Sequence, residues 1–140
     1  MKTERFTLKA SRLNAAMINP ESVIWPLLAR KLKEINEIAE ANGARLIVGY
    51  YPGLVEIYAP WIENGDAYVA WHGRVVSWLE RQGRENGFGV FDYTPAIQNA
   101  IYGRKITASL TDYHPNEAGV RLMFDVALPY VREALGQANQ

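Results

Sequence analysis

The feature that most constrains the fold is a nearly continuous apolar run, ARLIVGYY, at Ala44 to Tyr51. A strand with one face in water alternates polar and apolar residues, whereas a strand buried on both faces reads as an unbroken apolar run. A second run, FGVFDY at Phe88 to Tyr93, has the same character. Each run follows or lies beside an Asn-Gly pair, at 42–43 and 86–87, which is typical of a helix end. We therefore predict two buried strands, each preceded by a helix.

Three segments repeat apolar residues at intervals of three and four, the pattern of an amphipathic helix. The first stripe is Trp25, Leu28, Leu32, Ile35 and Ala39. The second is Tyr68, Trp71, Val75, Trp78 and Leu79, with Asp66 placed as the cap. The third lies in a helix from about Asn116 to Leu135, bent at Pro129, and comprises Val120, Met123, Phe124, Ala127, Leu128, Val131 and Leu135. We expect each stripe to face the core.

The order helix, strand, helix, strand, helix predicts parallel strands joined by crossover connections. The expected fold is a single α/β domain over residues 1–140, with a small parallel sheet flanked by helices. A short helix from Pro95 to about Tyr102 should follow the second strand, and residues 54–66 read as a loop or broken helix at the surface. Residues 1–19 have uncertain structure, since they fit a short strand followed by a helical turn only weakly.

Two strands make a small sheet whose open edge must be covered. A second copy of the chain is the simplest cover, so we expect a homodimer that completes the sheet.

The composition excludes several classes of function. Fifteen basic and fifteen acidic side chains cancel, so no strong field favours nucleic acid as a partner. The chain has no cysteine and only two histidines, His72 and His114, so we expect no disulfide, no metal site and no cofactor. No segment has the length and apolarity of a signal peptide or a membrane span. As written, the chain is expected in the cytoplasm, or in the cell envelope if an N-terminal part is missing.

Aromatic residues gather where the strands are expected to end. Open α/β sheets bind ligands at the carboxyl ends of their strands, so a small-molecule pocket is predicted there. Its candidate residues are Tyr50, Tyr51, Tyr93, Tyr113 and Trp61. The alternative is that these side chains pack at the rim of the core with their polar atoms in water.

His72 lies beside the apolar stripe of its predicted helix. A partly exposed structural histidine is the default interpretation of this residue.

The stretch TDYHPNEAG, from Thr111 to Gly119, is where we expect the catalytic residues of this chain. It places Asp112 two residues before His114, and an Asp can orient an imidazole through Nδ1 while Nε2 accepts a proton from a nucleophile. The alternative is structural, because Asp, Thr and Asn beside a helix start are common for capping reasons alone.

The string D-x-H-P-N-x-x-G resembles the last motif of the SGNH hydrolases, also called GDSL-type esterases. The resemblance extends upstream through GARLIVGYYP and GFGVFDYTPAIQ, and covers the chain from about Pro20 onward. It implies the C-terminal half of a flavodoxin-like three-layer sandwich, similar to cell-envelope members that act on acyl or acetyl esters. By this resemblance His114 is the general base, Asp112 its orienting carboxylate, and Asn116 and Gly119 the start of the following helix.

The same family carries its nucleophilic serine in a Gly-Asp-Ser motif, and that motif and the oxyanion-hole motifs are missing from this sequence. Ser109 lies in the same loop as the Asp-His pair and is the candidate nucleophile within the chain. We therefore expect an Asp-His half-site for an ester or carbohydrate-like ligand that is weakly active or inactive alone. The alternative is a non-catalytic, truncated α/β module that self-associates and binds a small ligand or a partner protein.

Overall fold

The computed structural model describes residues 24–101, 106 and 114–137, and the prediction for residues 1–19 lies outside them. The elements in chain order are α2 (Ile24–Ala41), β1 (Ile47–Tyr50), α3 (Leu54–Tyr58), the 3₁₀ turn η1 (Ala59–Trp61), α4 (Asp66–Asn86), β2 (Gly89–Asp92), α5 (Thr94–Ile101) and α6 (Glu117–Gln137). The α/β class and the order of the elements confirm the prediction.

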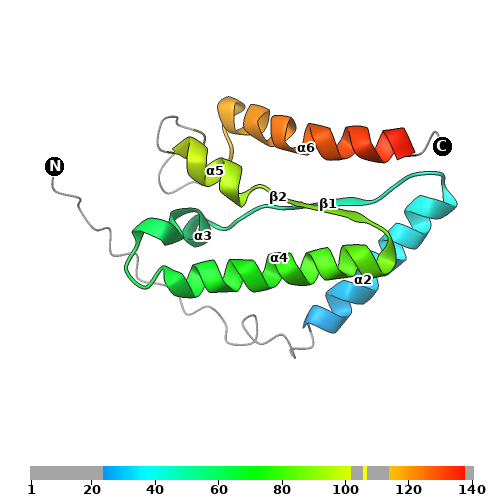
Figure 1. The fold of residues 1–140 in the computed structure, drawn as a ribbon, viewed down its shortest axis with the longest axis horizontal. Coiled ribbons are helices and arrows are strands. Elements are labelled where there is room, and N and C mark those ends of the chain that lie inside the picture. The colour runs from blue at the N-terminus through cyan, green and yellow to red at the C-terminus, as the bar shows by residue number, and fades with distance from the viewer. Residues whose placement is uncertain (1–23, 102–105, 107–113, 138–140) are drawn as a thin grey trace.

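The sheet of the described residues consists of β1 and β2, paired in parallel. Ile47 aligns with Gly89 at one end, and Tyr50 aligns with Asp92 at the other. Figure 1 shows α4 and α2 on one face of the sheet and α5 and α6 on the other, with α3 beside the end where the strands finish. We call these the α4 face and the α6 face.

Left-handed glycines end the two helices that precede the strands. Gly43 has φ +68° and Gly87 has φ +79°, a conformation that costs a side chain with a Cβ more than it costs glycine. The N–H of Gly87 donates to the carbonyl of Gly83 at 2.8 Å, which closes the last turn of α4. Both Asn-Gly pairs therefore act as the sequence predicts.

The start of α4 differs from the prediction. The capping position is Gly65, and Asp66 is the first residue of the helix. No described side chain makes a capping hydrogen bond at this helix start. A Cβ on Gly65 would lie 1.8 Å from the carbonyl oxygen of Ala59, so the close approach of η1 fixes a glycine there. The segment before it is a broken helix, as predicted, but it is not wholly at the surface, since Ile57 is fully buried.

The core has two clusters, one on each face of the sheet. The cluster on the α4 face contains Trp25, Leu32, Val75, Leu79 and Phe88. The cluster on the α6 face contains Ile57, Ile97 and Ile106, with Leu122 of α6 packed against it. The stripe predicted for α4 faces the core as expected, because Val75 and Leu79 are buried and Trp71 and Trp78 pack against them.

The stripe predicted for α2 is only partly buried, which corrects the sequence interpretation. Trp25 and Leu32 are buried, but Leu28 and Ile35 are 41% and 49% exposed. Trp25 and Leu32 join the cluster that contains Val75 and Leu79 of α4, so one narrow strip of the surface of α2 is covered. The third buried residue of that strip is Asn36, whose Nδ2 donates to the carbonyl of Asn86 at 2.7 Å and to Glu40 Oε1 at 2.9 Å.

Four of the seven residues of the α6 stripe are also exposed. The exposed members are Val120, Phe124, Val131 and Leu135. The helix contacts the sheet through a different side, where the ring of Tyr130 stacks on Phe91 with centroids 4.8 Å apart. Gly49 of β1 makes room for Phe91, because a Cβ at Gly49 would lie 2.7 Å from Phe91 Cζ. The periodicity therefore located α6 but not the side that it buries.

Candidate functional site

The carboxyl ends of β1 and β2 carry a cluster of polar side chains. Tyr50 ends β1 and Asp92 ends β2, and the two residues are paired in register. Side chains two apart on a strand share a face, and both residues lie on the face of Val48 and Val90, which pack toward α4. There they meet His72 of α4, whose ring centroid lies 5.6 Å from that of Tyr50.

His72 and Asp92 form an ion-pair-type hydrogen bond. His72 Nε2 lies 2.8 Å from Asp92 Oδ2, and the two side chains are 20% and 16% exposed. The other carboxylate oxygen of Asp92 accepts the backbone N–H of Thr94 at 2.8 Å, at the start of α5. An ionised carboxylate only accepts hydrogen bonds, so Nε2 of His72 is the donor in this bond. The pair ties α4 to the junction of β2 and α5.

Tyr50 is held by a second carboxylate. Its hydroxyl donates to Oε1 of Glu56, while Oε2 of Glu56 accepts the backbone N–H of Gly53 at 2.8 Å. Gln98 of α5 donates to the backbone carbonyl of Glu56 at 3.0 Å. Glu56 therefore connects the end of β1 to α3, and α3 to α5.

The environment of Tyr50 keeps its hydroxyl protonated. Burial raises the pKa of Tyr50 well above its ordinary value, and the hydrogen bond to Glu56 and the charges of Glu56 and Asp92 raise this pKa further. Tyr93 also has a raised pKa because of burial. Both phenols are therefore hydrogen-bond donors rather than nucleophiles at neutral pH.

The described residues contain no group of three or more His, Cys, Asp or Glu side chains that could hold a metal ion. Among them, no helix is both long and apolar enough to cross a membrane. The chemistry of the cluster is that of an Asp-oriented imidazole beside a neutral phenol.

The tyrosines predicted to line one pocket lie on both faces of the sheet. Tyr50 faces α4 and His72, whereas Tyr51 and Tyr93 pack against the isoleucine cluster of the α6 face. The rings of Tyr51 and Tyr93 meet edge to face at 6.3 Å. Trp61 lies in η1 and is 40% exposed. Tyr113 is outside the described residues, so the pocket prediction stays a prediction.

His114 lies just before α6 and is exposed. Two hydrogen bonds and one close backbone approach define the helix start beside it. Asn116 Oδ1 caps α6 by accepting the N–H of Gly119 at 3.0 Å, and the N–H of Asn116 donates to the carbonyl of Ile106 at 3.1 Å. A Cβ on Gly119 would lie 2.1 Å from that same carbonyl oxygen. The predicted capping role of Asn116 is thus confirmed, and Gly119 is explained by the close approach of Ile106.

Asp112 and Ser109 lie outside the described residues, so the predicted pairing with His114 and the predicted nucleophile stay predictions. The Asp-His pair that the described residues do contain, His72 with Asp92, was missed in the sequence. A signal for it existed, since Asp92 directly ends a buried strand, the usual place for site residues in parallel sheets.

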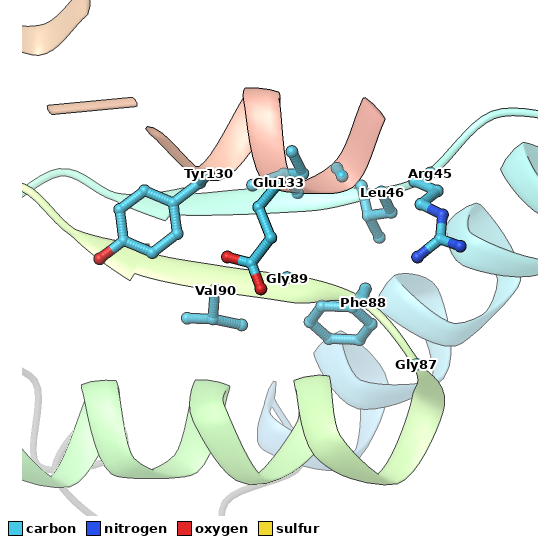
Figure 2. A pocket seen from close by; sticks show the side chains of 10 residues that line it. Arg45, Leu46, Gly87, Phe88, Gly89, Val90, Tyr130 and Glu133 are labelled. Carbon is cyan, nitrogen blue, oxygen red and sulfur yellow. The ribbon is translucent and has the colours of Figure 1, made fainter. Parts of the chain in front are cut away.

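A pocket of about 340 Å³ lies at the opposite end of the sheet, where the strands begin. Figure 2 shows Tyr130 and Glu133 reaching from α6 toward β2, with Arg45 and Leu46 on the approach to β1. Gly89 and Val90 of β2 line it from the sheet side. The predicted ligand residues are not among those that line it, and no motif in the sequence pointed to this place.

Comparison of the chain with protein-family models, with curated proteins and with solved structures finds no match in any of the three.

Proposed function

We propose that this chain supplies the Asp112-His114 half of an SGNH-type site that hydrolyses acyl or acetyl esters. The observation that carries the proposal is the helix start that follows His114. Asn116 and Gly119 belong to the D-x-H-P-N-x-x-G string, and both have a defined structural task in the first turn of α6. Because Asn116 and Gly119 fix the start of α6, they can also hold His114, which lies just before the helix, at a defined position relative to the sheet.

The position of α6 supports the same role. Leu122, in the second turn of α6, packs on the cluster that contains Ile97 of α5, and α5 directly follows the carboxyl end of β2. His114 therefore lies toward the end of the sheet where parallel α/β proteins place their active residues. Its exposure allows the imidazole to meet a substrate that arrives from solvent.

The proposed mechanism is general-base catalysis. His114 removes a proton from the attacking hydroxyl while Asp112 orients the ring and stabilises its charged form. The described residues include Ser77, which is exposed on α4, the helix that covers the other face of the sheet. The nucleophile is therefore a serine outside the described residues or, in its place, a water molecule. Without a serine the general base contributes roughly a hundredfold to ten-thousandfold.

The test is hydrolysis of a short-chain p-nitrophenyl ester by the purified protein. We expect slow turnover above the buffer rate, reduced to that rate in His114→Ala. The matched control is His72→Ala, which removes the other histidine of the chain, already bonded to Asp92. Circular dichroism verifies the fold of both variants.

A rate that survives in His114→Ala but is lost in folded His72→Ala would overturn the proposal and give the catalytic role to the His72-Asp92 pair. Equal rates in the wild type and both variants would exclude a histidine base. If turnover depends on His114, the variant Ser109→Ala tests whether Ser109 is the nucleophile. Turnover should be lost if Ser109 attacks the ester, and it should be unaffected if a water molecule does.

A further inference from the structure

The exposed side of α6 carries a narrow apolar stripe. Val120, Phe124, Val131 and Leu135 are 56%, 61%, 40% and 62% exposed. At about 100° per residue, these four positions fall within roughly 60° of arc around the helix. Large apolar side chains that line up on one exposed strip are more than the scattered surface residues of an ordinary monomer.

The stripe is complementary to itself. Val120 and Leu135 lie equally far from the midpoint between Ala127 and Leu128, and so do Phe124 and Val131. An antiparallel copy of α6 centred on that midpoint would place Val120 against Leu135 of the second copy, and Phe124 against its Val131. The smaller Ala127 would face Leu128 of the second copy at the centre, which suits close helix packing.

The charges beside the stripe fit the same arrangement. Asp125 and Arg132 are both exposed, and at about 100° per residue they lie on one flank of the stripe within roughly 20° of each other. In an antiparallel pair the same flanks meet, so Asp125 approaches Arg132 of the second copy, and the reverse contact forms by symmetry. In a parallel pair the same flanks lie on opposite sides of the seam, so neither contact between Asp125 and Arg132 would form.

The other exposed apolar helix lacks this complementarity. Ile24, Leu27, Leu28, Ile35 and Ile38 of α2 are exposed, but Lys31 lies at the middle of that stripe. An antiparallel copy of α2 centred on the stripe would put Lys31 against Lys31 of the second copy. Lys31 is instead paired with Glu34 within its own helix. The α2 stripe is thus a poor surface for self-association.

We propose that α6 is a dimerisation surface, on which the α6 helix of a second copy docks antiparallel about a two-fold axis near Ala127 and Leu128. This differs from a dimer that completes the sheet, because the strand edges take no part in it. Pro129 does not obstruct the contact, since it lies about 180° around the helix from Val120. The inference does not depend on ester hydrolysis.

The test is sedimentation of the full chain over a range of micromolar concentrations. We expect a monomer–dimer equilibrium that Phe124→Glu shifts to monomer, because the change places a charge in the apolar seam. The matched control is Ile38→Glu, an equally exposed isoleucine of α2, which should leave the equilibrium unchanged. A monomer at all concentrations, or a dimer broken by Ile38→Glu and not by Phe124→Glu, would overturn the proposal.

A charge exchange tests the orientation. Asp125→Arg should weaken the dimer by roughly tenfold, since it faces Arg132 of the second copy, and Arg132→Asp in the same chain should restore it. Weakening without restoration in the double variant would reject the antiparallel arrangement. Because all these residues are exposed, loss of folding is not expected to obscure either result.

Discussion

The two faces of the sheet differ in what they bury and what they expose. On the α4 face, five large side chains form a cluster, and His72, Asp92, Tyr50 and Glu56 are bonded to one another or to backbone. On the α6 face, three isoleucines form the cluster, while His114 and a stripe of apolar residues are exposed. The α4 face therefore has the larger buried cluster, and the α6 face carries the two exposed features on which the proposed catalysis and the proposed dimer depend.

The largest expected effect is on the α4 face. Leu79→Ala should lower the free energy of unfolding by about 2 to 5 kcal/mol, because Leu79 is 6% exposed at the centre of its cluster. Val69→Ala, at a position of the same helix that is 47% exposed, should change it by less than about 0.5 kcal/mol. Urea denaturation gives both values, and similar losses in the two variants would contradict the assignment of the core.

The next effect concerns the start of α6. Gly119→Ala should destabilise by about 1 to 3 kcal/mol, because its Cβ would overlap the carbonyl oxygen of Ile106. Gly136→Ala, in the same helix with no atom within 4 Å of the added Cβ, should stabilise by up to about 1 kcal/mol. Thermal denaturation of the two variants should therefore move in opposite directions, and a shift of the same sign would refute the close contact.

A smaller effect is expected from the cap of α6. Asn116→Ala removes the acceptor for the Gly119 N–H and should cost about 1 kcal/mol. Asn116→Asp keeps an acceptor and should retain most of the stability. Amide hydrogen exchange should speed up in the first turn of α6 in the alanine variant and not in α4. Unchanged protection at Gly119 would show that the cap contributes nothing.

An effect no larger than that of the cap is expected at neutral pH from the polar network of the α4 face. Tyr50→Phe removes the hydrogen bond to Glu56 and should cost about 0.5 to 1.5 kcal/mol. The folded pKa of Tyr50 is raised, so its contribution is complete below the ordinary tyrosine pKa of about 10 and is lost as pH rises through the folded pKa. Stability curves of the wild type and Tyr50→Phe should therefore converge in alkali, and parallel curves would exclude this linkage.

Local patterns predicted the elements well and their faces less well. Both strands, their parallel pairing and both glycine stops could be inferred, because each depends on a few adjacent residues. The buried side of α2 could not, because its partner covers only Trp25, Leu32 and Asn36. Periodicity shows that a helix has an apolar side, but the area of the neighbouring element decides how much of it is buried.

The candidate site shows the same division. The capping task of Asn116 is local and was predicted, whereas the pair of His72 and Asp92 joins two elements and depends on how α4 lies over the sheet. The close approach of Ile106 that requires Gly119 is likewise a tertiary contact, invisible in the sequence. The pairing of Asp112 with His114 stays a prediction.

The parallel pairing of β1 and β2 also determines the order of events during synthesis. Ile47 pairs with Gly89, 42 positions later in the chain. At about 5 to 20 residues per second, a ribosome needs roughly 2 to 8 s to produce that interval. Throughout that time the apolar residues of β1 lack β2, their pairing partner among the described residues, and an unpaired apolar strand is a template for aggregation. The seconds after β1 emerges are therefore when this chain depends most on dilution or on chaperones.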